Sequence, residues 1–289
     1  MNEQLLQQGF NVLSSASVYA LVAIGLSVIF GLSGIINIAY GDFMTLGAYV
    51  VFVVAPGGAI AFIWGFAASA VAVAVLSIVL ERALFRWTLI RPVNGFLVSL
   101  GLAQIIENGV AWHFGQDSVT VAPANSANWT LGGVIMSADR VIIILGTVAL
   151  VVGLILFLDR TQTGTAIRAI AADREAAALM GIPVTRLVTG VFALGGLIAG
   201  LGGGFVALLQ PPYPLLGAEL VLKGFVVALV GGLGSVRGAV IGAVLLAFIE
   251  TVLVTAGLAG WLDVIEFGAV ILLLIIRPQG LARGLAHSM

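Results

Sequence analysis

Residues 187–209 have the sequence LVTGVFALGGLIAGLGGGFVALL, which contains no charged side chain. About 17 to 25 apolar residues are enough for an α-helix to cross a bilayer, so this stretch predicts a membrane-spanning helix. The whole chain of 289 residues shares its character, with 61% apolar residues, 9% charged residues and a mean hydropathy of +1.20. Soluble domains carry roughly 25% charged residues. The composition therefore excludes an ordinary soluble fold and indicates the bilayer as solvent.

The same criterion predicts eight or nine membrane spans in one all-α polytopic domain covering residues 1–289. The predicted spans lie near 14–33, 38–55, 59–80, 94–114, 140–158, 187–209, 219–234, 238–256 and 262–276. Segment 219–234 leaves the number open, because it is short and carries Glu219 and Lys223. It ends in the glycine-rich run at 231–234, so a full span, a broken helix and a re-entrant segment all remain possible readings.

The basic residues predict an orientation in the membrane. With nine spans and the amino terminus outside, ten of the twelve Lys and Arg residues fall on one side, and only Arg140 and Lys223 lie elsewhere. The ten are Arg82, Arg86, Arg91, Arg160, Arg168, Arg174, Arg186, Arg237, Arg277 and Arg283. Because basic loops stay in the cytoplasm, the carboxyl terminus is predicted to lie there too. Segment 115–139 is polar and has no Lys or Arg, which is typical of an external loop.

Several kinds of chemistry are excluded by what the chain lacks. It has no cysteine and only two histidines, His113 and His287, so thiolate and histidine metal sites are not expected. The run from Gly200 to Gly204 is not followed by the Gly-Lys-Ser/Thr of a nucleotide-binding loop, so no ATP site is predicted. Ser33 in Gly31-Leu32-Ser33-Gly34 lacks a nearby embedded base, which argues against an intramembrane protease.

Glycines four residues apart predict close contacts between helices. The spacing occurs at Gly196-x-x-x-Gly200, Gly200-x-x-x-Gly204 and Gly238-x-x-x-Gly242. Small residues at this spacing let helix backbones approach each other in lipid. Packing is therefore their expected role.

Acidic residues within the apolar spans are candidates for a substrate path. Asp42 lies in IINIAYGDFMTLGAYVVFVV at 35–54, where the apolar residues outweigh the roughly 2.5–3.5 kcal/mol cost of inserting one carboxylate. Glu107 and Glu250 are similar, and Glu219 with Lys223 has the i, i+4 spacing of a helix ion pair. A structural role in bonding neighbouring helices is the alternative for each. The predicted substrate-path residues are Asn37, Tyr40, Asp42, Glu107, Glu219 and Lys223.

The predicted cytoplasmic stretch 159–186, DRTQTGTAIRAIAADREAAALMGIPVTR, is long and rich in helix formers. Asp173 is placed to cap a short helix that ends at Gly181, before Pro183. A solvated helix on the bilayer surface and a helix that docks on a partner are both compatible with this composition.

The predicted helix contains the pattern Glu175-Ala176-Ala177-x-x-x-Gly181. This pattern resembles the motif of ABC importer permeases whose short cytoplasmic coupling helix docks on the ATPase. The Ile-x-Leu-Pro that ends the complete motif is absent from this sequence. Further blocks closely resemble the LivH-type subunit of branched-chain amino-acid ABC permeases, in the expected order over nearly the whole chain. They are NIAYGDFMTLGAY at 37–49, the TGxAxRA and DxEAAxxxGI patterns at 163–169 and 173–182, the run from Lys223 to Ser235, and RPQGL at 277–281.

This resemblance implies a permease subunit, not an enzyme, in the plasma (inner) membrane of a bacterium. The implied partners are a LivM-like second permease, two cytoplasmic ABC ATPases that bind ATP and Mg, and an extracytoplasmic substrate-binding protein; nucleic acid is not implied. The substrate would be a branched-chain or related small amino acid, moved by ATP-driven alternating access. The residues implied to couple to the ATPase are Arg168, Asp173, Arg174, Glu175, Ala176, Ala177 and Gly181.

Two other classes of transport protein remain open from the residues alone. An ion-gradient-driven secondary transporter would use Asp42, Glu107, Glu219 and Glu250 as proton or sodium sites. A channel is the third alternative. Neither needs an ATPase, so dependence on ATP separates both from the importer.

Overall fold

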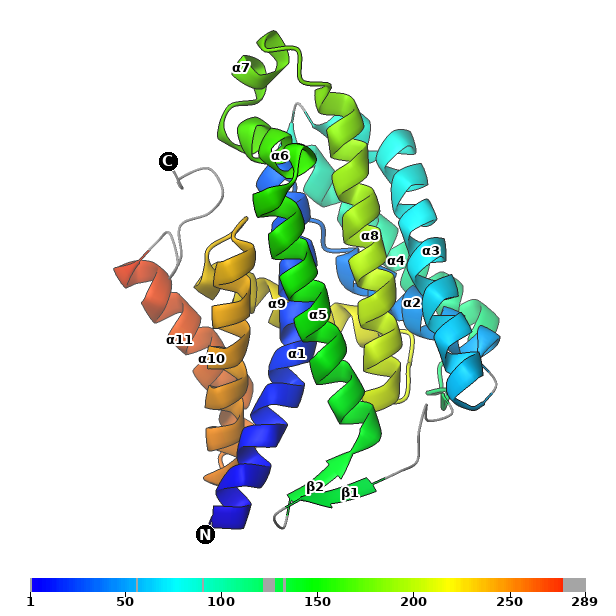
Figure 1. Ribbon diagram of the computed structural model, residues 1–289, viewed down its shortest axis with the longest axis vertical. Coiled ribbons are helices and arrows are strands. Elements are labelled where there is room, and N and C mark those ends of the chain that lie inside the picture. The colour runs from blue at the N-terminus through cyan, green and yellow to red at the C-terminus, as the bar shows by residue number, and fades with distance from the viewer. Residues whose placement is uncertain (1, 56, 90, 122–127, 132–133, 278–289) are drawn as a thin grey trace.

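The computed structural model describes residues 2–55, 57–89, 91–121, 128–131 and 134–277. Among these residues the fold is a helical bundle with one small hairpin (Figure 1). The first half contains α1 Asn2–Ser33, α2 Tyr40–Val54, α3 Ala59–Ala83, the 3-10 helix η1 Phe85–Thr88, α4 Pro92–Phe114, β1 Asn128–Leu131 and β2 Val134–Ser137. The second half contains α5 Ala138–Arg160, α6 Gln162–Ala172, α7 Arg174–Leu179, α8 Val184–Leu209, α9 Leu216–Gly231, α10 Val236–Thr255, η2 Ala259–Trp261 and α11 Leu262–Ile276. Four sequence features lie outside the described residues: positions 278–281 of the RPQGL block, Arg283, His287, and parts of the predicted external loop.

Six of the described helices, α1, α3, α4, α5, α8 and α10, are long and apolar enough to cross a membrane. The chain is therefore an all-α multi-pass membrane protein. Three others are shorter, with 15 residues in α2, 16 in α9 and 15 in α11. A helix of 15 residues is only about 22 Å long, less than the roughly 30 Å hydrocarbon core. The helix expected at 219–234 forms at 216–231, so it begins and ends three residues earlier than predicted.

The helices form two similar sets that run in opposite directions. The series α1, α2, α3, η1, α4 has the same order of long, short, long, 3-10 and closing helices as α8, α9, α10, η2, α11. The packing corresponds as well, since α1 lies against α10 and α9, while α8 lies against α3 and α2. Figure 1 shows that α1 begins at the lower end of the bundle and α8 at the upper end. Inverted repeats of this kind are common in transporters, where sites lie between the two repeats.

The glycine spacing in α8 marks its contacts with α2 and α3. A Cβ on Gly200 would lie 2.5 Å from the Ser69 carbonyl oxygen of α3, and one on Gly203 would overlap the Met44 carbonyl oxygen of α2. Ser69 bonds across this contact, since its hydroxyl donates to the Gly200 oxygen at 2.8 Å. Close packing is thus confirmed as the role of these glycines.

The two ends of the bundle differ in character. At the lower end, β1 and β2 pair antiparallel, with Asn128 opposite Ser137 (Figure 1). The hairpin lies within segment 115–139, which the sequence predicted as an external loop between two spans, and it was not itself predicted. At the upper end lie the end of α3, the start of α4, and the α6–α7 pair. These are the segments that carry most of the basic residues.

Candidate functional site

The segment before α2 enters the middle of the protein without helical structure. Ser99 of α4 holds it in place, because its hydroxyl accepts from the Ile38 amide at 3.0 Å while it donates within α4 to the Phe96 carbonyl at 2.7 Å. Gly41 then packs directly on Gly217, at the start of α9, where neither position has room for a Cβ. The starts of the short helices α2 and α9 therefore meet, which places Asp42 beside α9, while the Tyr40 ring packs on Gly25 of α1.

Three predicted path residues lie buried around this meeting point. Asn37, Tyr40 and Asp42 are each at most 1% exposed. Both amide atoms of Asn37, the Tyr40 hydroxyl and Oδ1 of Asp42 have no hydrogen-bond partner among the described residues. Buried polar atoms are normally bonded to protein or to water, so these atoms are available to bond water or a polar solute in another state of the protein.

Glu107 of α4 lies near Asp42 and interacts with it electrostatically. Its carboxylate is buried and accepts from the Gln104 amide at 2.9 Å. Four of the six predicted path residues, Asn37, Tyr40, Asp42 and Glu107, are thus gathered around the start of α2.

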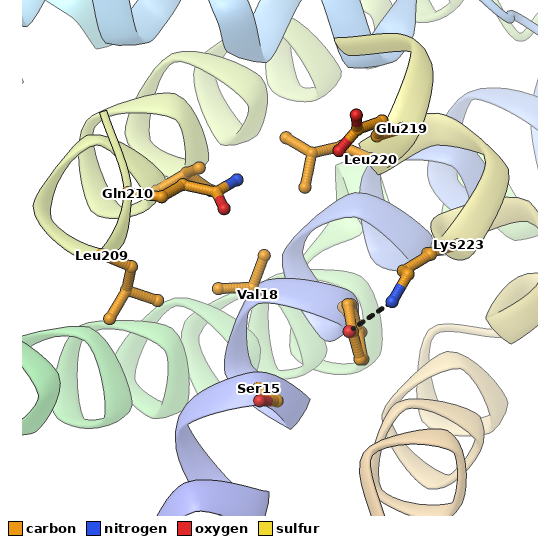
Figure 2. A pocket seen from close by; sticks show the side chains of 9 residues that line it. Ser15, Val18, Leu209, Gln210, Glu219, Leu220 and Lys223 are labelled. Carbon is orange, nitrogen blue, oxygen red and sulfur yellow. Dashed lines mark hydrogen bonds between the residues drawn. The ribbon is translucent and has the colours of Figure 1, made fainter. Parts of the chain in front are cut away.

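The other two path residues, Glu219 and Lys223, line a separate cavity of about 200 Å³ between α1, α8 and α9. Figure 2 shows Ser15 and Val18 of α1 on one wall and Leu209 and Gln210, from the end of α8, on another. The cavity therefore combines two charged side chains with several apolar ones.

Lys223 makes a different ion pair from the expected one. Its ammonium pairs with Glu250 of α10 and donates to the Tyr19 hydroxyl of α1 at 3.1 Å, and Tyr19 in turn donates to Glu250. Glu219 instead accepts from Tyr213 in the loop before α9, and burial together with this carboxylate raises the pKa of the Tyr213 phenol. The expected i, i+4 pair between Glu219 and Lys223 is wrong, because Glu250 offers Lys223 a partner across the helix interface.

Three polar residues of the interior were missed by the sequence reasoning. Tyr19 completes the bonds of Lys223, and the buried Glu266 of α11 interacts electrostatically with Glu250 and Lys223. The fully buried Glu81 of α3 accepts from Thr189 of α8 at 2.7 Å and pairs with Arg86. An available signal was the position of Tyr19 and Glu266 inside apolar stretches, where polar groups need partners.

The predicted coupling segment forms two helices beyond the upper end of the bundle (Figure 1). Asp173 caps α7, since its carboxylate accepts from the Glu175 and Ala176 amides at 2.9 Å each. Gly181 follows the helix with a φ of +80°, in the left-handed region that glycine occupies at little cost. The predicted cap and the predicted end of this helix are both confirmed.

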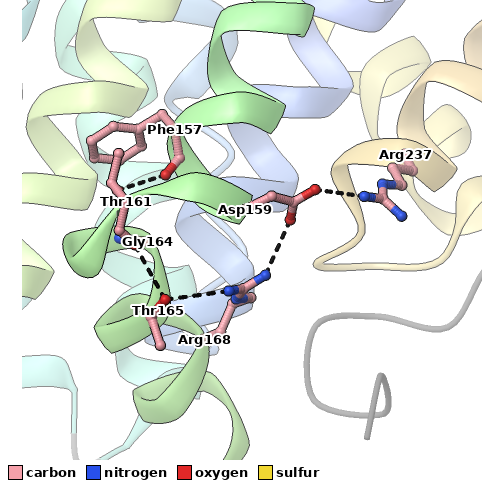
Figure 3. A network of polar contacts seen from close by, with 7 residues as sticks. All are labelled: Phe157, Asp159, Thr161, Gly164, Thr165, Arg168 and Arg237. Carbon is pink, nitrogen blue, oxygen red and sulfur yellow. Dashed lines mark hydrogen bonds and ion pairs between the residues drawn. The ribbon is translucent and has the colours of Figure 1, made fainter.

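The tip of α7 exposes apolar side chains away from the spanning helices. Leu179 is 89% exposed and Met180 is 82% exposed. Behind the tip, Asp159 at the end of α5 pairs with Arg168 of α6 at 3.1 Å and with Arg237 at the start of α10 (Figure 3). This network joins α6 to α10, the helix that also carries Glu250.

Comparison with known proteins identifies relatives along nearly the whole chain. The BraD permease protein of a high-affinity branched-chain amino acid transport system in Pseudomonas aeruginosa is 30% identical over 96% of this chain and 95% of its own length. The corresponding LivH protein of Escherichia coli is 28% identical over 97% of each chain. The ribose import permease protein RbsC of Escherichia coli is also 28% identical, over 92% of this chain and 84% of its own. No solved structure matches the chain.

The family model described as the permease component of branched-chain amino acid transport systems matches residues 9–275. This range contains both short helices, the cavity and the α6–α7 pair. The chain therefore belongs to the family of branched-chain amino acid transport system permease components.

Proposed function

We propose that the chain is the transmembrane permease subunit of a binding-protein-dependent ABC importer. It moves branched-chain or related small amino acids across the bacterial inner membrane by ATP-driven alternating access. Its partners are a LivM-like second permease, two cytoplasmic ATPases that bind ATP and Mg, and an external binding protein. Family membership and the names of its relatives support this proposal.

In the proposed orientation, the amino terminus and the β1–β2 hairpin lie outside, and α6 and α7 lie in the cytoplasm with the carboxyl terminus. The six long helices and the shorter α2, α9 and α11 together give nine crossings of one permease domain. The support is the gathering of basic residues at the upper end of the bundle, which the positive-inside rule assigns to the cytoplasm.

The observation that best supports this proposal is the exposed tip of α7, formed by Leu179 and Met180. Leu179 and Met180 are apolar and exposed, and they lie between the Asp173 cap and Gly181, away from the spanning helices (Figure 1). An apolar pair presented in this way fits the groove of a partner protein. The ATPase would pull on α7, and the Asp159 network would pass the movement to α10.

The substrate path is proposed to pass the meeting point of α2 and α9. The unpaired buried atoms of Asn37, Tyr40 and Asp42 supply polar contacts there, and Glu107, Glu219 and Lys223 lie on either side. Hydrolysis of ATP resets the equilibrium between inward-facing and outward-facing states.

Replacing Glu175 and Gly181, as Glu175→Ala with Gly181→Val, should uncouple ATP hydrolysis from uptake. Valine is strained at a φ of +80°, so the tip loses its position while the spans stay assembled. We expect ATP-driven leucine uptake per permease to fall at least about tenfold, which corresponds to about 1.4 kcal/mol. The measurement is uptake and hydrolysis in vesicles containing the reconstituted importer.

The control is Gln162→Ala, an exposed change at the start of α6 that leaves α7 intact. Uptake by this variant should equal that of the unaltered importer. Unchanged coupling in the Glu175 and Gly181 variant would contradict the docking role of α7.

A further inference from the structure

The cavity between α1, α8 and α9 has the size of a small solute. Its volume of about 200 Å³ is far more than the roughly 10–15 Å³ of such space that a single water molecule needs, so it admits a small solute. The family does not decide the chemistry of that ligand, since its relatives include both amino acid and ribose permeases. The chemistry of the ligand therefore has to be inferred from the side chains that line the cavity.

Lys223 offers the cavity a positively charged donor. An ammonium has three N–H donors, and its bonds to Glu250 and Tyr19 use two of them. The side chain remains 34% exposed and lines the cavity (Figure 2). A carboxylate in the cavity can thus accept from Lys223 while the existing ion pair stays intact.

Glu219 offers the complementary acceptor one helical turn earlier on α9. Its carboxylate accepts from Tyr213 and, because an ionised carboxylate has about four acceptor sites, it can accept further bonds. Four residues of helix rise separate Glu219 from Lys223 by about 6 Å. That spacing lets a single ligand with adjacent ammonium and carboxylate groups contact both residues.

Beside the charged pair, the wall has an aliphatic part, formed by Val18, Val206, Leu209 and Leu220, and a polar part, formed by Ser15, Tyr19 and Gln210. Val18 of α1, Leu209 of α8 and Leu220 of α9 face the cavity together with the charged pair. An aliphatic side chain on the ligand would bury its surface against them. A sugar could bond Ser15 and Gln210 through its hydroxyl groups, but it carries neither a carboxylate for Lys223 nor an ammonium for Glu219, and it would match the four aliphatic side chains poorly.

We propose that this cavity is a binding subsite for a small aliphatic zwitterion, whose carboxylate accepts from Lys223 and whose ammonium donates to Glu219. The proposal rests on the proposed transport function and specifies where, and by which charges, the permease itself recognises its substrate.

The chain contains no cysteine, so a single introduced thiol reports one position when modification is read on this subunit after separation from its partners. Ser15 lines the cavity and is close to cysteine in shape, so Ser15→Cys places one thiol in the wall. The assembled permease–ATPase complex, purified in detergent, is treated with a water-soluble thiol reagent. The rate of modification is measured with leucine, with 4-methylpentanoate, which lacks the ammonium, with 3-methylbutylamine, which lacks the carboxylate, and with ribose.

Leucine should slow modification of the thiol at least about fivefold at saturation, and each half-analogue should need at least about tenfold more ligand, since each loses one charge-assisted bond. Ribose should give no protection. Adding Glu219→Gln should raise the leucine concentration for half-protection about tenfold. The control Ser118→Cys, an exposed position outside the cavity, should be modified equally with and without leucine.

The proposed subsite is contradicted if ribose protects the thiol as well as leucine does, or if leucine gives no protection. It is also contradicted if Glu219→Gln leaves the leucine concentration for half-maximal protection unchanged. If ATP-driven leucine uptake holds while the thiol at position 15 stays unprotected, the subsite fails alone. If protection holds while uptake proves independent of ATP, the importer proposal fails and the subsite stands.

Discussion

Gly203→Ala should destabilise the protein by about 1–3 kcal/mol or more, although alanine favours helices by about 1 kcal/mol. The added Cβ overlaps the Met44 carbonyl oxygen and lies 2.8 Å from the Ala48 nitrogen, so it meets backbone and not a flexible side chain. Helices α2 and α8 would have to move apart. The start of α2 carries Tyr40 and Asp42, so the same change should disturb the proposed path. Thermal unfolding of the purified protein in detergent measures the loss.

Gly190→Ala is the matched control, because it is the same substitution in the same helix. A Cβ at Gly190 meets nothing within 4 Å. The stability of the Gly190→Ala variant should equal that of the unaltered protein or exceed it by up to about 1 kcal/mol. Equal melting temperatures for Gly203→Ala and Gly190→Ala would contradict the close packing of α8 on α2.

Lys223 and Glu250 should show strong coupling in a double-mutant cycle. Glu250→Gln leaves the ammonium without its anionic partner, and Lys223→Gln leaves the carboxylate without its cation, so each should cost about 1.5–3 kcal/mol. The double variant, in which two neutral amides face each other, should cost less than the sum by at least about 1 kcal/mol. Because the pair joins α9 to α10, with Tyr19 of α1 bound to both, unfolding in detergent reports it directly.

The comparison pair for this cycle is Arg168 with Asp159, in which both side chains are about one-third exposed, whereas the Glu250 side chain of the first pair is only 12% exposed. Solvent screens such a pair, so the same amide substitutions should couple by about 0–1 kcal/mol. Additive effects at Lys223 and Glu250, no larger than those at Arg168 and Asp159, would show that the interior pair does not hold the helices together.

Local features of the fold could be predicted from the sequence, and long-range ones could not. The cap at Asp173 and the end of its helix at Gly181 depend on residues within one turn, so their spacing was sufficient. The partner of Lys223 was predicted wrongly, because i, i+4 spacing identifies Glu219 and says nothing of Glu250, which lies 27 positions away and on another helix. Only tertiary packing decides between them.

The same limit applies to the meeting of α2 and α9. Asp42 is a candidate from the sequence because an acidic residue in an apolar span is costly, and Asn37 and Tyr40 stand beside it in the same stretch 37–49 that resembles the permease family. That Gly41 packs on Gly217 follows from the two opposed sets of helices, whose similarity lies in the order and length of the helices. Hydropathy located the spans, but it carries no information on which short helices meet.

The most direct test of the account is leucine uptake into vesicles that contain the chain with its permease, ATPase and binding-protein partners. The account predicts uptake that requires ATP, stops when ATP is depleted, and persists when the proton and sodium gradients are collapsed. Uptake that survives ATP depletion but disappears with the ion gradient would contradict it, and would assign the buried carboxylates, Asp42 among them, to a secondary transporter.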